Sequence, residues 1–123
     1  MGSTYRKEML ESEIKKVLTI ALRETKIPNI DPLYISIVRV TVSKDKRYST
    51  VLISYFGDKE PEKKEKIVEI LNENKGYFRT AVAKNIRLFK APEIRFKLDK
   101  GLEASMRVQE ILNKIHEEDN KNW

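Results

Sequence analysis

Seven basic side chains lie in one short segment of the 123-residue chain, where together they could bind a polyanion. Residues 75–97 hold one acidic residue, Glu93, so the segment carries a net charge of 7 − 1 = +6. The whole chain also has a net charge of 25 − 19 = +6, so the rest of the sequence is balanced. A charge excess confined to one stretch favours a phosphate-binding surface. The seven residues are Lys75, Arg79, Lys84, Arg87, Lys90, Arg95 and Lys97.

The simplest alternative for these cations is a solvated helix face that carries lysine for solubility. Arginine adds bidentate phosphate contacts and stacking on bases. If about four phosphates are neutralised, a plot of log affinity against log salt concentration should have a slope of about −3 to −4. Aromatic residues in the same stretch could stack on bases. Of Tyr77, Phe78, Phe89 and Phe96, the pattern favours the core for Phe78 and Phe96 and leaves Tyr77 open.

Residue types suited to catalysis or metal binding are few. Cysteine is absent, which excludes disulfides and thiolate chemistry. The one histidine, His116, lies beside Glu117 and Glu118 near the C-terminus, where we expect it to be solvated. The carboxylates show no spacing typical of an acid–base pair, and no phosphate-binding glycine pattern occurs. We therefore predict a protein that is not an enzyme, with no cofactor, no metal and no small-molecule substrate.

The length suits one domain with a sizeable core. We predict a single domain over residues 1–116 and a polar, frayed tail over residues 117–123. No apolar run approaches the roughly 20 residues needed to span a bilayer, and no signal-peptide core is present. We expect a cytoplasmic protein with no membrane partner.

Apolar periodicity predicts a helix, a hairpin, two consecutive helices, a strand and a last helix. The two hairpin strands are β-branched and joined by a short charged turn, which favours antiparallel pairing. The predicted ranges are Tyr5–Glu24, Tyr34–Ser43, Tyr48–Phe56, Pro61 to about Glu73, Gly76 or Tyr77 to about Leu88, Glu93–Leu98, and Leu102 to about His116.

In the first strand, simple alternation places Ile35, Ile37, Arg39 and Thr41 on one face. The hairpin turn carries a second, smaller basic cluster of Lys44, Lys46 and Arg47. We interpret this cluster as an ordinary solvated turn in preference to a second binding site.

The residues Asn74-Lys75-Gly76 interrupt the helical pattern, and we predict an interhelical kink there. Asparagine and glycine are poor helix formers that tolerate capping or left-handed geometry. The side-chain oxygen of Asn74 can accept a backbone N–H and so cap the second helix. The missing Cβ of Gly76 could let a sugar-phosphate approach the backbone.

The element order α-β-β-α-α-β predicts a two-layer α+β domain, with one small three-stranded sheet and helices packed on one side. Two helices joined by a break and followed by a strand are typical of KH-type nucleic-acid domains. Ordinary KH domains use a GXXG loop to clamp the nucleic-acid backbone. No GXXG occurs in this chain.

Over almost its whole length the sequence resembles the ribosome-binding factor A family. The matching pieces occur in the family's order and spacing, which together are fairly specific. They are Asp31-Pro32-Leu33, Val42-Ser43-Lys44-Asp45, Gly76-Tyr77-Phe78-Arg79, Leu88, Pro92-Glu93-Ile94-Arg95-Phe96, Asp99 and Met106-Arg107. The chain departs from the family pattern with Asn74 in place of alanine, and at Gly101 and Ser105.

This resemblance implies a type-II KH-like fold (α-β-β-α-kink-α-β) with an added C-terminal helix, in which an Ala-x-Gly kink replaces GXXG. It implies binding to the immature small ribosomal subunit and its rRNA during maturation and rRNA processing, with a link to growth in the cold. It also implies no catalytic activity and no cofactor. We expect a monomer when the protein is off the ribosome.

Two other functions remain open from the sequence. One is a protein-interaction module that uses the first or last amphipathic helix. The other is a generic single-strand RNA-binding KH protein, against which the missing GXXG argues.

Overall fold

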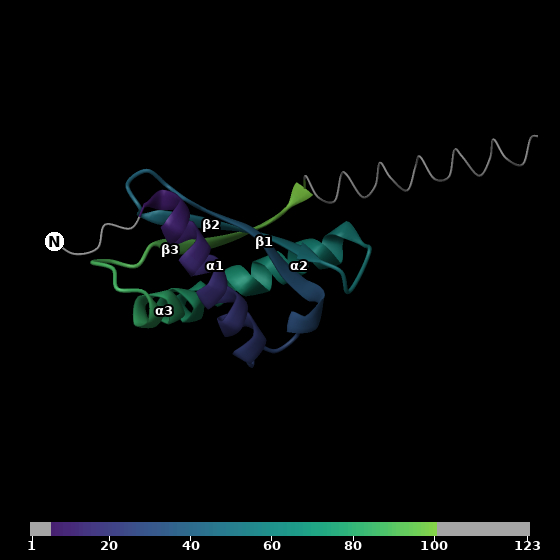
Figure 1. Cartoon of the computed structure of the whole chain (residues 1–123). Coiled ribbons are helices and arrows are strands. Elements are labelled where there is room, and N and C mark those ends of the chain that lie inside the picture. The colour runs from purple at the N-terminus through teal and green to yellow at the C-terminus, as the bar shows by residue number, and fades with distance from the viewer. Residues whose placement is uncertain (1–5, 101–123) are drawn as a thin grey trace, which may run out of the picture.

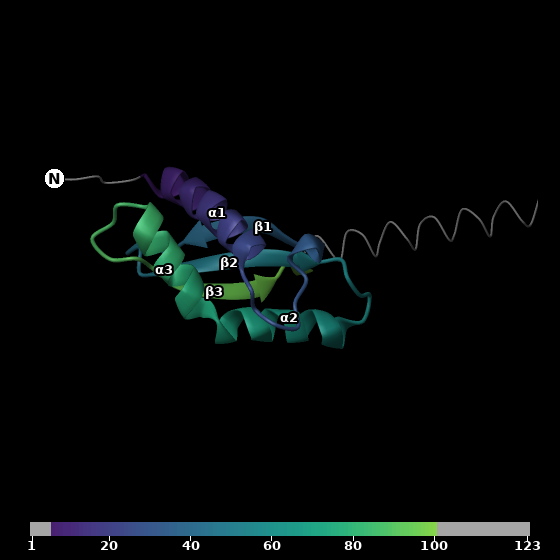
Figure 2. The ribbon, with the colours of Figure 1, turned by 90° about the horizontal axis from the view of Figure 1, so that it is seen from below.

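The computed structural model describes residues 6–100, and within this range three helices cover one face of a three-stranded sheet (Figure 1, Figure 2). The strand order is β1-β2-β3, with β1 antiparallel to β2 and β2 parallel to β3. The predicted α+β architecture and antiparallel hairpin are confirmed. The elements are α1 (Lys7–Glu24), the 3-10 helix η1 (Pro32–Tyr34), β1 (Ile35–Val42), β2 (Tyr48–Tyr55), α2 (Pro61–Glu73), α3 (Lys75–Asn85) and β3 (Glu93–Leu98).

A β-bulge at Val38 changes the faces predicted for β1. Ile37 and Arg39 pair with consecutive residues of β2, so Val38 between them is an extra residue. One extra residue shifts a two-residue alternation to the opposite face. The predicted alternation was therefore wrong beyond Ile37. The buried residues of β1 are Ile35, Ile37, Val40 and Val42.

The break between α2 and α3 is one residue, Asn74, with φ −108° and ψ 20°. Lys75 and Gly76, which we predicted as part of the break, already belong to α3. The Asn74 side-chain nitrogen donates to the Ile70 carbonyl at 2.9 Å, which satisfies a group in the last turn of α2. The prediction that Asn74 caps α3 was wrong, because its side chain makes no capping hydrogen bond there.

The helix α3 ends at Asn85, not at about Leu88 as predicted. Ile86 has extended backbone, with φ −124° and ψ 127°, and its side chain is buried in the core. The Asn85 side chain donates to the Ala81 carbonyl at 2.7 Å and satisfies a group in the last turn. Arg87 therefore lies in the loop that leads to β3.

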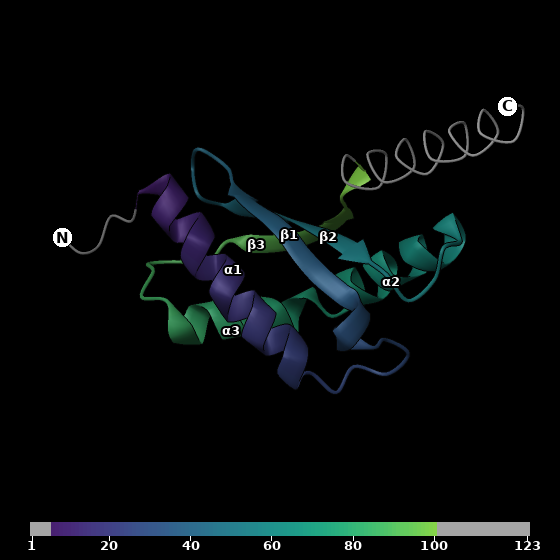
Figure 3. The ribbon, with the colours of Figure 1, turned by 45° about the vertical axis from the view of Figure 1, so that its right-hand side comes forward.

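The core lies between the sheet and the helices, and α1 contacts both β1 and α3 (Figure 3). Phe78 of α3 and Phe96 of β3 meet edge to face, with ring centroids 5.0 Å apart. Both rings are buried, as predicted. The fully buried residues that the helices contribute are Leu10, Ile14, Leu18, Leu71, Phe78 and Val82.

The predicted strand Glu93–Leu98 matches β3. The predicted helix at 102–116 and the polar tail at 117–123 lie outside the described residues. Within residues 6–100, no helix combines the length and the apolar character needed to cross a bilayer.

Candidate nucleic-acid interface

Three of the predicted cations lie together in sequence where α3 ends and the loop to β3 begins. Lys84 is in the last turn of α3, and Arg87 and Lys90 are in the loop. All three side chains are exposed. In residues 6–100 none of them forms an ion pair, so their charge is available to a ligand. We call these three residues the loop cations.

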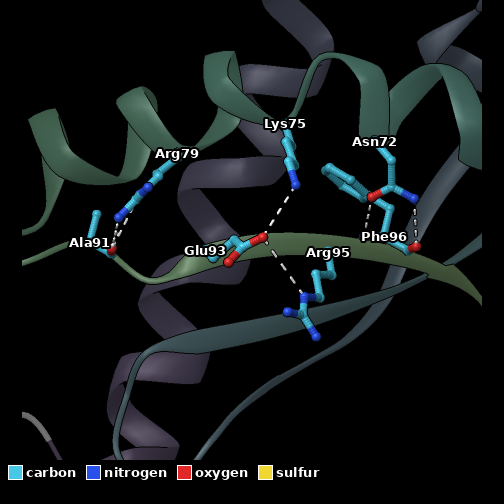
Figure 4. A network of polar contacts seen from close by, with 7 residues as sticks. All are labelled: Asn72, Lys75, Arg79, Ala91, Glu93, Arg95 and Phe96. Carbon is cyan, nitrogen blue, oxygen red and sulfur yellow. Dashed lines mark hydrogen bonds and ion pairs between the residues drawn. The ribbon is translucent and has the colours of Figure 1, made fainter.

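Two other predicted cations make contacts within the fold (Figure 4). The Lys75 ammonium lies 3.2 Å from Glu93 Oε1. The Arg79 guanidinium donates from Nε and Nη2 to the Ala91 carbonyl, at 3.3 and 3.1 Å. Arg79 thereby fixes the loop against α3, which is a structural role that the sequence does not reveal.

Arg95 and Lys97 lie on the outward face of β3, where they alternate with buried Ile94 and Phe96. Figure 4 shows Arg95 pointing away from α3. Its guanidinium carbon lies 4.3 Å from the centroid of the Tyr48 ring, a cation–π contact. Its Nε lies 4.0 Å from Glu93 Oε1. The seven predicted cations thus lie in three places: Lys75 and Arg79 in the first half of α3, Lys84, Arg87 and Lys90 at its end and in the loop, and Arg95 and Lys97 on the outward face of the sheet.

Glu93 is the acid that both Lys75 and Arg95 approach. The hydrogen bond from Lys75 holds the pKa of Glu93 below its ordinary value of 4.5, and the positive charges of Lys75, Arg95 and Arg79 act in the same direction. Glu93 therefore stays ionised at neutral pH and offsets part of the charge of its neighbours.

Asn72 of α2 occupies the free edge of β3 (Figure 4). Its side-chain nitrogen donates to the Phe96 carbonyl at 3.0 Å, and its oxygen accepts the Phe96 N–H at 2.8 Å. One amide thus pairs with the edge strand as a neighbouring strand would. A polar residue four positions after buried Val68 is the signal in the sequence that could have revealed this contact.

The kink region therefore offers little room beside β3 for a nucleic-acid strand. Asn72, Lys75 and Arg79 all bridge from the helices to β3 or to the loop before it. On the outer side, by contrast, a Cβ added at Gly76 would meet no heavy atom within 4 Å. The glycine leaves its backbone open to close approach and relieves no internal clash.

The four aromatic residues of the segment fall into separate roles. Phe78 and Phe96 are buried. Tyr77 is half-exposed, and its hydroxyl donates to the Ala21 carbonyl of α1 at 3.1 Å. Phe89 is fully exposed and makes no ring contact within the described residues. Phe89 is therefore the aromatic that can stack on a ligand without giving up an internal contact.

The described part of the chain has no cluster of side chains suited to a metal ion. Within residues 6–100, no group of three or more histidine, cysteine or acidic side chains could hold a metal ion. His116 lies outside this range. The exposed cations and the Phe89 ring can bind phosphate and stack on a base.

Comparison with known proteins gives matches over most of the chain. A family model described as Ribosome-binding factor A matches residues 6–112. The Ribosome-binding factor A of Kosmotoga olearia is 59% identical over 120 residues, which is 97% of this chain and 94% of that protein. The solution NMR structure of a Thermotoga maritima protein has a TM-score of 0.69 at 50% identity, covering 79% of this chain and 90% of that one.

A third match concerns a protein in a complex. A homology model of the Thermus thermophilus ribosome binding factor A, fitted into a cryo-EM map of its complex with the 30S subunit, has a TM-score of 0.59. It is 20% identical and covers 75% of this chain and 93% of that one. At this identity the likeness concerns the fold, and it agrees with the predicted KH-like architecture.

Proposed function

Because the chain belongs to the ribosome-binding factor A family, we propose that it binds the immature small ribosomal subunit and its rRNA. In this role it assists subunit maturation and rRNA processing through binding alone, with no catalysis of its own. It acts in the cytoplasm as a monomer when unbound, and it needs no cofactor, metal or membrane. The fitted complex of the Thermus thermophilus relative with the 30S subunit supports this choice of partner.

The observation that carries the proposal is the exposed, uncompensated charge of the loop cations. Lys84, Arg87 and Lys90 have no acidic partner within residues 6–100, whereas three other cations of the segment, Lys75, Arg79 and Arg95, are engaged internally. Unpaired cations gain most from a phosphate backbone, because they lose no internal contact when they bind it. The proposed contact with rRNA is therefore centred on the end of α3 and the loop after it.

Sedimentation of tagged protein with a cell extract tests the partner. We expect the protein to migrate with free small subunits and not with mature ribosomes. Nuclease treatment should release it, because the proposed contact is with RNA. Migration with a nuclease-resistant protein would favour a protein-interaction module instead and would contradict the proposal.

A charge-reversal variant, Lys84→Glu with Arg87→Glu and Lys90→Glu, tests the surface. Exposed ion contacts contribute up to about 1 kcal/mol each, so we expect roughly 10- to 100-fold weaker binding with the melting temperature retained. Arg79 is left intact because its guanidinium holds the loop.

The matched control reverses the same amount of charge at exposed cations outside the segment. Lys26→Glu, Lys59→Glu and Lys66→Glu give an equal change in net charge. We expect much smaller weakening than in the loop variant. Equal losses in the two triple variants would show a net-charge effect, and the loop cations would then not form the interface.

A further inference from the structure

A cleft of about 690 Å³ lies between the tip of the β1–β2 hairpin and the loop before β3. Residues 45–48 form one wall and residues 88–91 form the other, with Leu10 of α1 also lining the space. Figures 1 and 3 show the hairpin tip and this loop at the same end of the sheet. The second basic cluster of the sequence, at the hairpin turn, thus lies across the cleft from Lys90, one of the loop cations.

The walls of this cleft are held by internal hydrogen bonds. Asp45 accepts from the Ser43 hydroxyl at 2.7 Å and from the Arg47 N–H at 3.1 Å, which orders the hairpin turn. The Glu93 N–H donates to the Arg47 carbonyl at 2.8 Å and ties the two walls together. With Arg79 fixed on the Ala91 carbonyl, the space is formed before any ligand arrives.

The charges and the ring in this cleft suit a nucleotide. Its lining includes four basic residues and two acidic residues, so it keeps a net charge of 4 − 2 = +2. Asp45 pairs with Arg47 of the same wall at 3.8 Å, an exposed contact that a phosphate can replace, and Glu93 pairs with Lys75. Phe89, in the loop wall, is fully exposed, and the exposed cation Lys90 follows it. Nothing in the described fold uses the Phe89 ring.

We propose that this cleft receives an unpaired nucleotide of the rRNA, with the base stacked on Phe89 and its phosphates near Lys90 and Arg47. The volume lies within the roughly 300–1,000 Å³ typical of clefts that hold small ligands. Unpaired bases that stack on aromatic side chains are the usual targets of sequence-dependent RNA recognition. An excess of positive charge beside the ring favours RNA over an apolar protein segment. The inference rests on the proposed function and adds to it the kind of RNA feature that is bound.

Phe89→Ala tests the stacking contact, measured as the affinity for immature small subunits at several salt concentrations. Stacking of one base on an aromatic ring contributes enough that we expect about 5- to 150-fold weaker binding at every salt concentration. The slope of log affinity against log salt concentration should stay unchanged, because the substitution removes no phosphate contact. Phe89→Trp should bind within about threefold of the original chain, since it keeps a stacking face.

Phe56→Ala is the matched control, because Phe56 is an exposed aromatic residue just beyond the opposite end of β2. We expect it to bind as the original chain does. Base-specific chemical probing of the rRNA then identifies the occupant. At least one unpaired base should be protected by the original chain and by Phe89→Trp, and not by Phe89→Ala.

Unchanged affinity of Phe89→Ala would overturn the nucleotide site and leave the proposed function standing on the loop cations. Weaker binding with identical base protection would overturn it too, and would assign the cleft to a ribosomal protein. Failure of the original chain to bind small subunits at all would instead contradict the proposed function.

Discussion

Glu93 lies between two cations and pairs with both, at 3.2 Å from Lys75 and 4.0 Å from Arg95. The pairs are partly exposed, so each contributes little to stability. Their effect on the surface is larger, since one carboxylate lowers the local charge that Lys75 and Arg95 offer to a ligand. A count of cations in the sequence therefore overstates the charge available for binding.

The ion pairs that Glu93 forms with Lys75 and Arg95 should make the free energy of unfolding depend on pH. Because the folded-state pKa of Glu93 is below its ordinary value of 4.5, the pairs stabilise the fold fully above about pH 4.5. Their contribution is lost as the pH falls through the folded-state pKa. We expect the stability difference between the original chain and Glu93→Gln to shrink below about pH 4.5, measured by urea unfolding. A difference that stays constant down to pH 2 would contradict this assignment.

Gly76→Ala tests whether glycine at this position is required for folding or for RNA binding. Gly76 lies in the first turn of α3 with a negative φ, and a Cβ there would meet open space. Alanine should therefore stabilise the protein by about 0.5–1 kcal/mol, measured by urea unfolding. If RNA approaches this backbone, the same variant should bind small subunits more weakly. A destabilised variant would show that the fold itself requires glycine.

At the scale of elements, the sequence predicted the helices and strands whose apolar periodicity is regular. The pattern in Tyr48–Tyr55 and in Glu93–Leu98 identified β2 and β3, and Pro61 marked the start of α2. The bulge at Val38 has no sequence signal of its own, since valine suits either face of a strand. The apolar spacing from Val82 to Ile86 continues the helical pattern, and Ile86 is buried, but its backbone is extended, so the pattern did not reveal that α3 ends at Asn85.

Among the site residues, the sequence identified Lys84, Arg87 and Lys90 as exposed cations, since basic side chains next to an apolar stripe stay in solvent. It did not predict that Lys75 and Arg79 are engaged internally. Their partners, Glu93 and the Ala91 carbonyl, become neighbours only when β3 packs beside α3. It also did not predict the cleft at Phe89, whose walls come from segments far apart in the chain.

Asn72→Ala should weaken the attachment of β3 to α2. The substitution leaves the Phe96 N–H and carbonyl without their partner on the free edge of the sheet. We expect a loss of about 1–3 kcal/mol in the free energy of unfolding. The control is Asn85→Ala, which removes an exposed side-chain contact to Ala81 and should cost less than about 0.5 kcal/mol. Equal losses for the two variants would mean that Asn72 does not support β3.

At the scale of the whole molecule, part of the excess positive charge lies at one end of the sheet, and Arg95 and Lys97 add charge on the outward face of β3. At that end, Lys90 lines one side of the cleft, and Lys46 and Arg47 of the hairpin turn line the other. A surface of this kind orients the protein as it approaches a polyanion, and salt should weaken its binding.

The slope of log affinity against log salt concentration should indicate how many cations contact phosphates. If the loop cations and Arg47 make about four contacts, the slope should be about −3 to −4. Contact by all seven cations of residues 75–97 would give about −5 to −6. Affinities measured between about 50 and 300 mM salt can distinguish these values, and a slope near zero would contradict an electrostatic interface.

The parallel pairing of β3 with β2 has a consequence for how the chain reaches its native state. The hairpin closes over a few residues, but β3 can join β2 only after residues 56–92 have crossed over with α2 and α3. Contacts between distant segments form late, because closing a long loop costs entropy. We expect Ile94→Ala mainly to accelerate unfolding and Val51→Ala also to slow refolding, measured by stopped-flow kinetics. During synthesis, the hairpin can therefore assemble before the strand beside the cleft has been translated.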